Sequence, residues 1–355
     1  MTEPSDSSDG GAEPSFQFGG DLATPQRLAY GLVPLIQLLE ARGHDVGEVL
    51  DATEIPRFAL EEPSFRIGVA QEVDFTRRAL ALLDEPLAAL EVGRRFHLSM
   101  FGLFGLAAAC APSVREALHI FLSYPALVWG LNEVTFWRQG DEEYVAFRPG
   151  AAAAELAGHF IERDMAALLM MLRNVLGEGI RPDALMLTRP PPPQAAAYDA
   201  FFGCPVVFAA AADRIRFPAM VWDAVPPQAN AMSRRFFENQ CRRLSESMAA
   251  PFRFTDIVRA RLRAATPIPS LAALGSVLYL TTRTLQRRLR AEGTSYSQVL
   301  REVRIERAEA LLRQPGVRIE AIAWRLGFEG PDAFSRAFRA WQGCAPSVFR
   351  SRLQR

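Results

Sequence analysis

The chain has 355 residues, of which 49% are hydrophobic and 23% charged, a composition that excludes a disordered or fibrous protein and predicts two or three domains. Its formal net charge is zero, but the charge is unevenly distributed. The segment 253–355 contains 19 arginines against 8 acidic residues, a net charge of +11, and the preceding 252 residues carry −11. An acidic module joined to a basic one is typical of a protein with a nucleic-acid-binding end.

The first 20 residues are rich in Ser, Asp, Gly and Pro and lack a basic start followed by an apolar run, so we expect a disordered tail and no signal peptide. The most apolar long stretch, 160–176, is interrupted by four charged residues, so we expect no segment that spans a membrane. The four cysteines lie far apart and form no CxxC motif, which is typical of reduced thiols in the cytoplasm. They are Cys110, Cys204, Cys241 and Cys344.

The next 200 residues combine helical and alternating patterns. Apolar spacing predicts helices over 23–42, 66–83, 87–96, 113–124 and 151–176, and strands are expected at 133–138, 144–148, 184–188 and 215–218, with 206–208 as a further candidate. Ser113, with Glu116 three residues later, resembles a capping box. The order predicts an α+β sensor domain over 21–225, in which several helices precede a small antiparallel ββαββ sheet. We expect this domain to bind an effector and to form a homodimer.

A polar helical stretch over 226–252 is predicted to link the sensor to an all-α domain over 253–355. This domain contains a degenerate repeat at a shift of 48 and then 49 residues, which relates Leu274 to Ile322, Gly275 to Ala323 and Leu285 to Phe334. Each copy consists of a short amphipathic helix, a tight turn and a second helix. The small residues at 275 and 323 allow the two helices to cross closely. We therefore predict two helix-turn-helix units, at about 270–290 and 319–341.

The second helix of each copy has apolar residues on one side and hydrogen-bonding residues on the other. Arginine can donate two hydrogen bonds to guanine, and glutamine can pair with adenine, so the outer faces suit the major groove of DNA. A helix over 296–312 would hold the two readers at a fixed distance. The predicted DNA-binding residues are Arg283, Gln286, Arg287, Arg290, Asp332, Ser335, Arg336 and Arg339.

The repeat resembles the DNA-binding domain of the AraC/XylS family. The resemblance rests on TRTLQRRL at 282–289 and AEGTS at 291–295, and on IAWRLGF at 322–328, AFSRAFRAW at 333–341 and APS at 345–347. It implies a bacterial transcription regulator, and we expect an activator that acts with RNA polymerase, with both helix-turn-helix units on one rigid seven-helix domain. By the family pattern, bases would be contacted by Arg283, Gln286 and Arg287 and by Asp332, Ser335 and Arg336. The chain departs from this pattern at Gly275 and at Gly330-Pro331.

The N-terminal module resembles the ligand-binding domain of the branch of this family that is named for arabinose binding. The matching stretches are EVG at 91–93, FGLFGLA at 101–107, APSVREAL at 111–118 and FFGCPV at 201–206. The predicted helices followed by ββαββ differ from the jelly roll of the sugar-sensing namesake. We therefore carry over no sugar ligand, and the effector is expected to be a small organic molecule of unknown identity.

Aromatic residues cluster before and within the predicted hairpin. They either belong to the hydrophobic core or line a mostly apolar effector pocket, and the sequence leaves both readings open. The candidate effector-binding residues are His97, Phe101, Phe104, Trp129 and Trp137.

Two other classes of protein are alternatives to an effector-responsive regulator. An architectural DNA-binding protein without an effector would need only cations, whereas the outer faces here also carry Gln286 and other uncharged polar residues. A fused DNA-repair alkyltransferase would need a zinc-type cysteine cluster and a reactive cysteine. The sequence contains no HExxH, GxSxG or P-loop motif, and its histidines have no metal-ligand spacing. We predict no catalytic residue, cofactor or metal, and therefore no enzyme.

Overall fold

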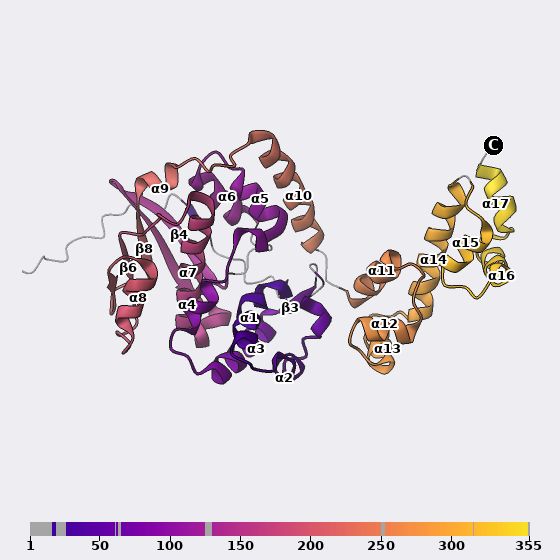
Figure 1. The fold of residues 1–355 in the computed structure, drawn as a ribbon, viewed down its shortest axis with the longest axis horizontal. Coiled ribbons are helices and arrows are strands. Elements are labelled where there is room, and N and C mark those ends of the chain that lie inside the picture. The colour runs from indigo at the N-terminus through magenta and orange to yellow at the C-terminus, as the bar shows by residue number, and fades with distance from the viewer. Residues whose placement is uncertain are drawn as a thin grey trace, which may run out of the picture. The chain divides into compact units, whose positions relative to one another are not determined.

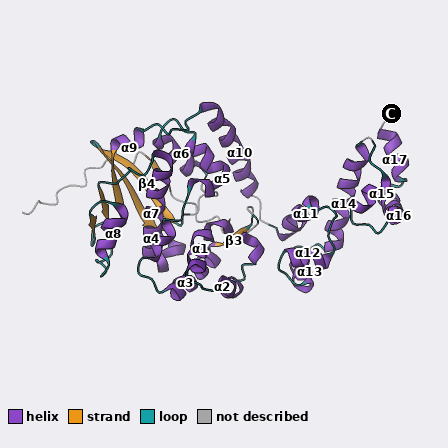
Figure 2. Cartoon of the chain, in the orientation of Figure 1, coloured by secondary structure: helices purple, strands orange, loops and turns teal. Residues whose placement is uncertain are grey.

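The structure, a computed structural model, describes residues 16–18, 26–60, 62, 65–124, 130–249, 253–314 and 316–353. The chain divides into two compact units (Figures 1 and 2). The first contains the described residues of 1–55 and 66–250, and the second contains those of 56–65 and 251–355. Strands are confined to the first unit among the described residues.

The first unit is built on a six-stranded sheet in the order β1-β4-β5-β8-β6-β7. All neighbouring strands are antiparallel except β6 and β7. Strands β4 and β5 form a long hairpin, in which Phe136 pairs with Val145 and Trp137 with Tyr144. The strands are β1 (Phe16–Phe18), β4 (Asn132–Gln139), β5 (Glu142–Pro149), β6 (Ala184–Met186), β7 (Val206–Val207) and β8 (Arg214–Pro218). A separate two-stranded sheet pairs β2 (Gln26–Leu28) with β3 (Arg66–Gly68).

Helices pack against this sheet around one main core. The long helix α7 (Ala157–Leu176) carries an apolar stripe whose buried members, such as Met165 and Leu169, contact buried residues of β4, β5 and β8. Helix α4 (Ala88–Gly93) crosses α7 so closely that a Cβ atom at Gly93 would lie 2.4 Å from the Cβ of Ala166. The other helices of this unit are α1 (Val33–Ala41), α2 (Val46–Ala52), α3 (Val69–Leu83), α5 (Gly102–Ala109), α6 (Val114–Ser123), α8 (Ala195–Phe202), α9 (Ala219–Asp223) and α10 (Ala231–Ala249).

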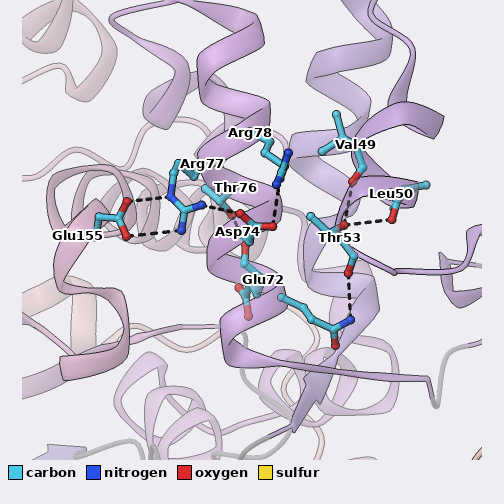
Figure 3. Close-up of polar contacts among 10 residues, drawn as sticks. Val49, Leu50, Thr53, Glu72, Asp74, Thr76, Arg77, Arg78 and Glu155 are labelled. Carbon is cyan, nitrogen blue, oxygen red and sulfur yellow. Dashed lines mark hydrogen bonds and ion pairs between the residues drawn. The ribbon is translucent and has the colours of Figure 1, made fainter.

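Polar contacts attach α3 to the elements on either side of it (Figure 3). The Thr53 hydroxyl donates to the Val49 carbonyl oxygen (2.8 Å), and the Gln71 amide donates to the Thr53 carbonyl oxygen (3.1 Å). On the other side, the Arg77 guanidinium donates to the Glu155 carboxylate (2.7 Å), in the 3₁₀ segment η5 (Ala151–Leu156). These contacts connect α2, α3 and η5 into one helical layer.

The helix that the sequence assigned to a linker, α10, lies in the first unit. Its Cys241 is completely buried in a small core with Phe104 and Ile120, and α10 packs along α5. Burial, together with the nearby Glu238 carboxylate, raises the pKa of the Cys241 thiol to about 11, so this thiol remains protonated at neutral pH. Cys241 therefore packs as a small apolar residue.

The second unit includes one segment from the first third of the sequence. The 3₁₀ segment η2 (Arg57–Leu60) places Phe58, which is completely buried, against the rings of Phe65 and Phe254 at centroid distances of 5.3 and 6.4 Å. The Glu62 carboxylate also lies 3.5 Å from the Arg261 guanidinium. Phe58 and Phe65 therefore contribute to the core of a unit whose other residues lie after position 250.

In the rest of the second unit, all regular secondary structure over the described residues is helical. Its helices are α11 (Phe254–Ala264), α12 (Leu271–Val277), α13 (Thr282–Ala291), α14 (Tyr296–Arg313), α15 (Ile319–Arg325), α16 (Pro331–Gln342) and α17 (Pro346–Leu353). The 18-residue helix α14, about 27 Å long at 1.5 Å per residue, separates α12 and α13 from α15 and α16 (Figure 1). Its Arg304 donates to the carbonyl oxygens of Leu326 and Gly327 at 2.9 and 2.8 Å, and its Tyr296 hydroxyl donates to that of Pro269 at 2.5 Å.

The predicted α+β fold followed by an all-α domain is confirmed. The sheet differs from the predicted antiparallel ββαββ order, because it also includes β1, its strands β6 and β7 are parallel, and helix α8 lies between them in sequence. The expected hairpin and the strands near 184, 206 and 215 are present. Ser113 caps α6, where its hydroxyl accepts from the Glu116 amide at 3.2 Å, as predicted. Residues 26–28 of the expected helix at 23–42 and residues 66–68 of that at 66–83 form β2 and β3 instead, because their backbones pair with each other. Of the expected tail, Phe16–Phe18 forms β1, and the remainder of 1–20 lies outside the described residues.

Candidate nucleic-acid interface and effector cavity

The two predicted helix-turn-helix units have matching backbone geometry. In the first, the Leu280 amide donates to the Gly275 carbonyl oxygen at 2.8 Å, and in the second the Phe328 amide donates to that of Ala323 at 2.9 Å. The residues one position earlier, Tyr279 and the glycine at 327, both have positive φ, 51° and 70°. These positions are related by the shift of 48 residues that defines the repeat. The internal sequence repeat is therefore also a structural repeat.

The second helix of each unit buries one face and exposes the other. Leu285 and Leu289 of α13 are completely buried. Phe334 and Phe338 of α16 are also completely buried. The opposite faces carry the eight residues predicted from the sequence to bind DNA. All are exposed except Ser335, which is half-buried: Arg283, Gln286, Arg287, Arg290, Asp332, Ser335, Arg336 and Arg339.

Some guanidinium groups of this unit form ion pairs or hydrogen bonds with other described residues, and others do not. On α11, Arg259 lies 3.0 Å from the Glu302 carboxylate and Arg263 lies 2.7 Å from that of Glu306, and Arg307 of α14 donates to the carbonyl oxygens of Leu262 and Ala265. By contrast, the predicted DNA-contacting arginines on α13 and α16 form no side-chain hydrogen bond or ion pair with a described residue; they are Arg283, Arg287, Arg290, Arg336 and Arg339. These five guanidinium groups are thus exposed cations without a partner in the described part of the chain.

Capping fixes where the second helix starts in the first unit. The Thr281 hydroxyl accepts from the Thr284 amide at 3.1 Å, two residues before Gln286. Helix α16 begins at Pro331, after the N-cap residue Gly330, which has no side chain to cap it; Pro331 lies in the first turn, where no backbone donor is required. Both helices therefore present their N-terminal turns in a defined conformation.

The first unit contains a cavity of about 140 Å³ between α5, α6, α7 and the hairpin β4–β5. Its walls are almost entirely apolar, formed by aromatic, aliphatic and small residues. They include Phe96, Phe101, Phe147, Leu168, Met171 and Trp222. A concave, mostly apolar cavity with a few convergent polar groups is the usual composition of a small-molecule site.

The polar end of the cavity consists of Asn132, Arg163 and Asp164. The Asn132 amide nitrogen donates to one Asp164 oxygen at 2.7 Å, and the Arg163 guanidinium donates to the other at 2.8 Å. Behind them, the carboxylate of the buried Glu72 lies 3.4 Å from Arg27 and 3.9 Å from Arg163. Burial raises the pKa of Glu72, and the two guanidinium groups oppose that shift. The cavity therefore ends on a buried network of paired charges.

His159 borders this network. Its ring lies edge-on to Phe160 at 5.5 Å, and burial, assisted by the positive charge of Arg163, lowers its pKa to about 3. His159 is therefore neutral at physiological pH, and it adds no charge to the polar end of the cavity.

Four of the five candidate effector residues lie among the described residues, and these four are not brought together around the cavity. Phe101 lines the cavity, and Phe104 packs beside it in the adjoining core at a ring distance of 6.1 Å. His97 is exposed, and Trp137 stacks on Tyr144 at 5.2 Å without lining the cavity. Trp129 lies outside the described residues. The described candidates therefore occupy different surroundings: the cavity wall for Phe101, the adjoining core for Phe104, the stack on Tyr144 for Trp137 and the surface for His97.

Sequence reasoning missed the polar end of the cavity. The available signal was the charged run Glu162-Arg163-Asp164 within the most apolar stretch of the chain, since charges on a buried helix need buried partners. Asn132 gave no comparable signal, because its position opposite α7 depends on how the sheet packs. Over the described residues, no cluster of His, Cys, Asp and Glu could hold a metal ion, and no helix is long and apolar enough to cross a membrane.

Comparison with known proteins matches both parts of the chain. A family model described as the arabinose-binding domain of AraC transcription regulators, N-terminal, matches residues 43–225, and a helix-turn-helix domain matches residues 274–352. An HTH-type transcriptional regulator of Mycobacterium tuberculosis is 31% identical over 336 residues, which cover 91% of this chain and 96% of the relative. The ornithine utilization regulator of Pseudomonas aeruginosa is 28% identical over 321 residues, 89% of this chain and 94% of the relative.

Among solved structures, the transcriptional regulator CdpR from Pseudomonas aeruginosa is similar with a TM-score of 0.44 and 26% identity, covering 91% of this chain and 98% of that one. The matched families and relatives are those of transcription regulators and not of enzymes.

Proposed function

The chain belongs to the AraC family of helix-turn-helix transcription regulators, and we propose that it is a sequence-specific activator that responds to a small organic effector. Helices α13 and α16 would enter successive major grooves on one face of the duplex, which lie ~34 Å apart. The first unit would bind the effector in its apolar cavity and hold two copies of the chain together as a homodimer. RNA polymerase would be the protein partner, in the cytoplasm.

The observation that carries this proposal is the difference between paired and unpaired arginines. Arg263 is neutralised by Glu306, whereas Arg287 and Arg336 are exposed without a partner among the described residues. An unpaired guanidinium fork can donate to guanine O6 and N7 or to phosphate without first breaking an internal ion pair. The exposed Gln286, next to Arg287 on α13, adds a group that can discriminate adenine and that a phosphate binder does not need.

The effector role rests on the cavity. It lies in the acidic unit, away from the arginine faces in sequence, and has the apolar walls and few polar groups of a small-molecule site. A regulator with such a site can couple the ligand to transcription only if the ligand binds differently to the two functional states of the protein.

The test begins with selection of bound sequences from random DNA duplexes by the full-length protein. On the selected site, Arg287→Ala and Arg336→Ala should each weaken binding by ~1–3 kcal/mol and relax the preference for the contacted base. The matched control is Arg263→Ala, which removes a paired, half-exposed arginine and should lower affinity only slightly and equally on all sequences.

An equal loss on selected and random DNA for Arg287→Ala and Arg336→Ala would mean that these residues hold phosphates and read no bases, as in an architectural binder. Binding should also weaken steeply as salt concentration rises, because neutralised phosphates release counterions. Salt-independent binding would contradict the electrostatic basis of the proposal.

A further inference from the structure

The second helices of the two helix-turn-helix units carry opposite charges at one equivalent position. A shift of 49 residues relates α16 to α13 and matches their N-cap residues, Thr281 in α13 and Gly330 in α16. The same shift matches Arg283 with Asp332, each of which is the second residue of its helix. Both side chains are exposed. A cation in the first helix-turn-helix unit therefore corresponds to an anion in the second.

At the other outer positions the two helices are alike in charge. The fourth and eighth residues of each helix are completely buried, so both helices turn the same face outwards. The other matched positions on these outer faces are either arginine in both helices or uncharged in both. The matched pairs are Gln286 with Ser335, Arg287 with Arg336, and Arg290 with Arg339. The exchange of Arg283 for Asp332 thus reverses one charge on an outer face that otherwise keeps its charges.

The Asp332 carboxylate is available for binding. It is exposed and forms no hydrogen bond or ion pair with a described residue, although Arg336 lies one turn further along the same helix. A carboxylate on a face that contacts DNA repels the phosphates and lowers non-specific affinity. A helix that only held the duplex would bind more tightly with a neutral or basic residue at this position. The aspartate is therefore expected to make a contact that a cation cannot make.

The two side chains suit different bases. The N-terminal residues of a recognition helix contact base edges in the major groove, and Arg283 and Asp332 lie in the first turns of α13 and α16. Arginine donates to O6 and N7 of guanine, whereas a carboxylate can only accept and suits the N4 amino group of cytosine. Because guanine and cytosine pair with each other, the exchange of arginine for aspartate reverses the orientation of the G·C pair that is read.

From these observations we propose that Asp332 sets the specificity of α16 by accepting a hydrogen bond from N4 of a cytosine, at the position where Arg283 of α13 donates to a guanine. The operator would then contain two half-sites, with G·C at this position in one and C·G in the other. The inference rests on the proposed function, because it needs sequence-specific binding, and it names the base that one position of each second helix selects.

The experiment repeats the selection from random DNA duplexes with variants of the full-length protein. Arg336→Ala identifies the half-site that α16 reads, because the base preference relaxes there. Within this half-site, Asp332→Asn should change the selected cytosine to adenine, because an amide pairs with adenine N6 and N7, and Asp332→Arg should change it to guanine. On the site selected by the unchanged protein, Asp332→Asn should bind about tenfold more weakly, the typical value of one hydrogen bond to a charged group.

Binding to random DNA gives a second readout, which a purely structural role of the carboxylate would not raise. Asp332→Asn removes a negative charge from the DNA-contacting face, so its affinity for random duplexes should rise, and the gain should shrink as salt concentration increases. A loss of affinity on the selected site together with a gain on random DNA is the result that a base-reading carboxylate predicts.

Two further variants serve as the reciprocal test and the control. Arg283→Asp should change the guanine of the other half-site to cytosine. The matched control, Glu320→Gln, removes one carboxylate from an exposed position of α15 and should leave every base preference unchanged. Hydrogen exchange of α16 in each free variant shows whether this helix remains folded.

A less stable α16 with an unchanged preference for cytosine in Asp332→Asn would mean that the carboxylate only stabilises the start of the helix through the macrodipole. A preference that changes only at the base read by Arg336 would mean that Asp332 orients that guanidinium group. Either outcome overturns the assignment and leaves the proposed function intact. Selection of no preferred sequence by the unchanged protein would instead overturn the proposed function, and this inference with it.

Discussion

The two helix-turn-helix units reach the same backbone geometry with different residues. At the equivalent left-handed position, the first turn has Tyr279 and the second has Gly327. At the start of the second helix, the first unit uses the side chain of Thr281 and the second uses Gly330 followed by Pro331. The turn therefore requires a left-handed backbone conformation and not a particular residue. Glycine is required at this position only where a neighbouring backbone comes close.

That neighbour is present in one unit only. A Cβ atom at Gly327 would lie 2.5 Å from the Ile268 carbonyl oxygen, whereas the Tyr279 side chain is 61% exposed. Positive φ disfavours any residue with a Cβ atom by ~1–2 kcal/mol, which Tyr279 tolerates because nothing crowds its side chain. The second turn could not accept a side chain without moving the backbone that precedes α12.

The largest expected effect is therefore that of Gly327→Ala. We expect the amides of α15 and α16 to lose ~2 kcal/mol or more of local stability, from the left-handed strain together with the overlap at Ile268. Hydrogen exchange of the full-length protein measures each unit separately, so α12 and α13 serve as an internal reference. Tyr279→Ala, the matched change at the equivalent position, should alter protection of the first unit by less than about 0.5 kcal/mol. Equal losses in the two units would show that the crowding at Gly327 has no energetic consequence.

A second difference concerns the crossing of the two helices. A Cβ atom at Gly275 would lie 2.7 Å from the Leu280 carbonyl oxygen, although the equivalent position in the second unit is the buried Ala323. Gly275→Ala should therefore destabilise α12 and α13 by ~1–3 kcal/mol, because the backbone around Leu280 must shift. The reverse change, Ala323→Gly, should cost ~1–2 kcal/mol, because glycine disfavours a helix and the buried methyl group of Ala323 is lost. Hydrogen exchange in the two units checks both values, and a neutral Gly275→Ala would mean that the first turn opens as widely as the second.

The sequence predicted what depends on local patterns and missed what depends on tertiary packing. Helices α6, α13 and α16 follow from spacing, caps and the repeat, and their exposed faces could be assigned residue by residue. Strands β2 and β3 have three residues each, too few for an alternating pattern to be read.

The effector cavity shows the same limit. Its lining comes from segments between Phe96 and Trp222 that meet only in the folded unit, so aromatic clustering in the sequence identified Phe101 and not the polar end at Asn132. The burial of Phe58 against Phe254 was equally unpredictable, because these residues are nearly 200 positions apart and lie in differently charged parts of the chain. Local patterns contain no information about such pairs.

The smallest expected effect concerns the helix caps. Thr281→Ala removes the acceptor for the Thr284 amide and should destabilise the first turn of α13 by ~1 kcal/mol, while Thr281→Ser should retain the cap. In the second unit, Gly330→Ser should stabilise α16 by only a few tenths of a kcal/mol, because glycine is already an acceptable N-cap and Pro331 restricts the first turn. Hydrogen exchange of the first-turn amides of α13 and α16 measures both changes. Since Arg283 lies in the same turn as Thr284, Thr281→Ala should also weaken binding to the selected DNA site, and full affinity in that variant would show that α13 is held in place by its buried Leu285 and Leu289 alone.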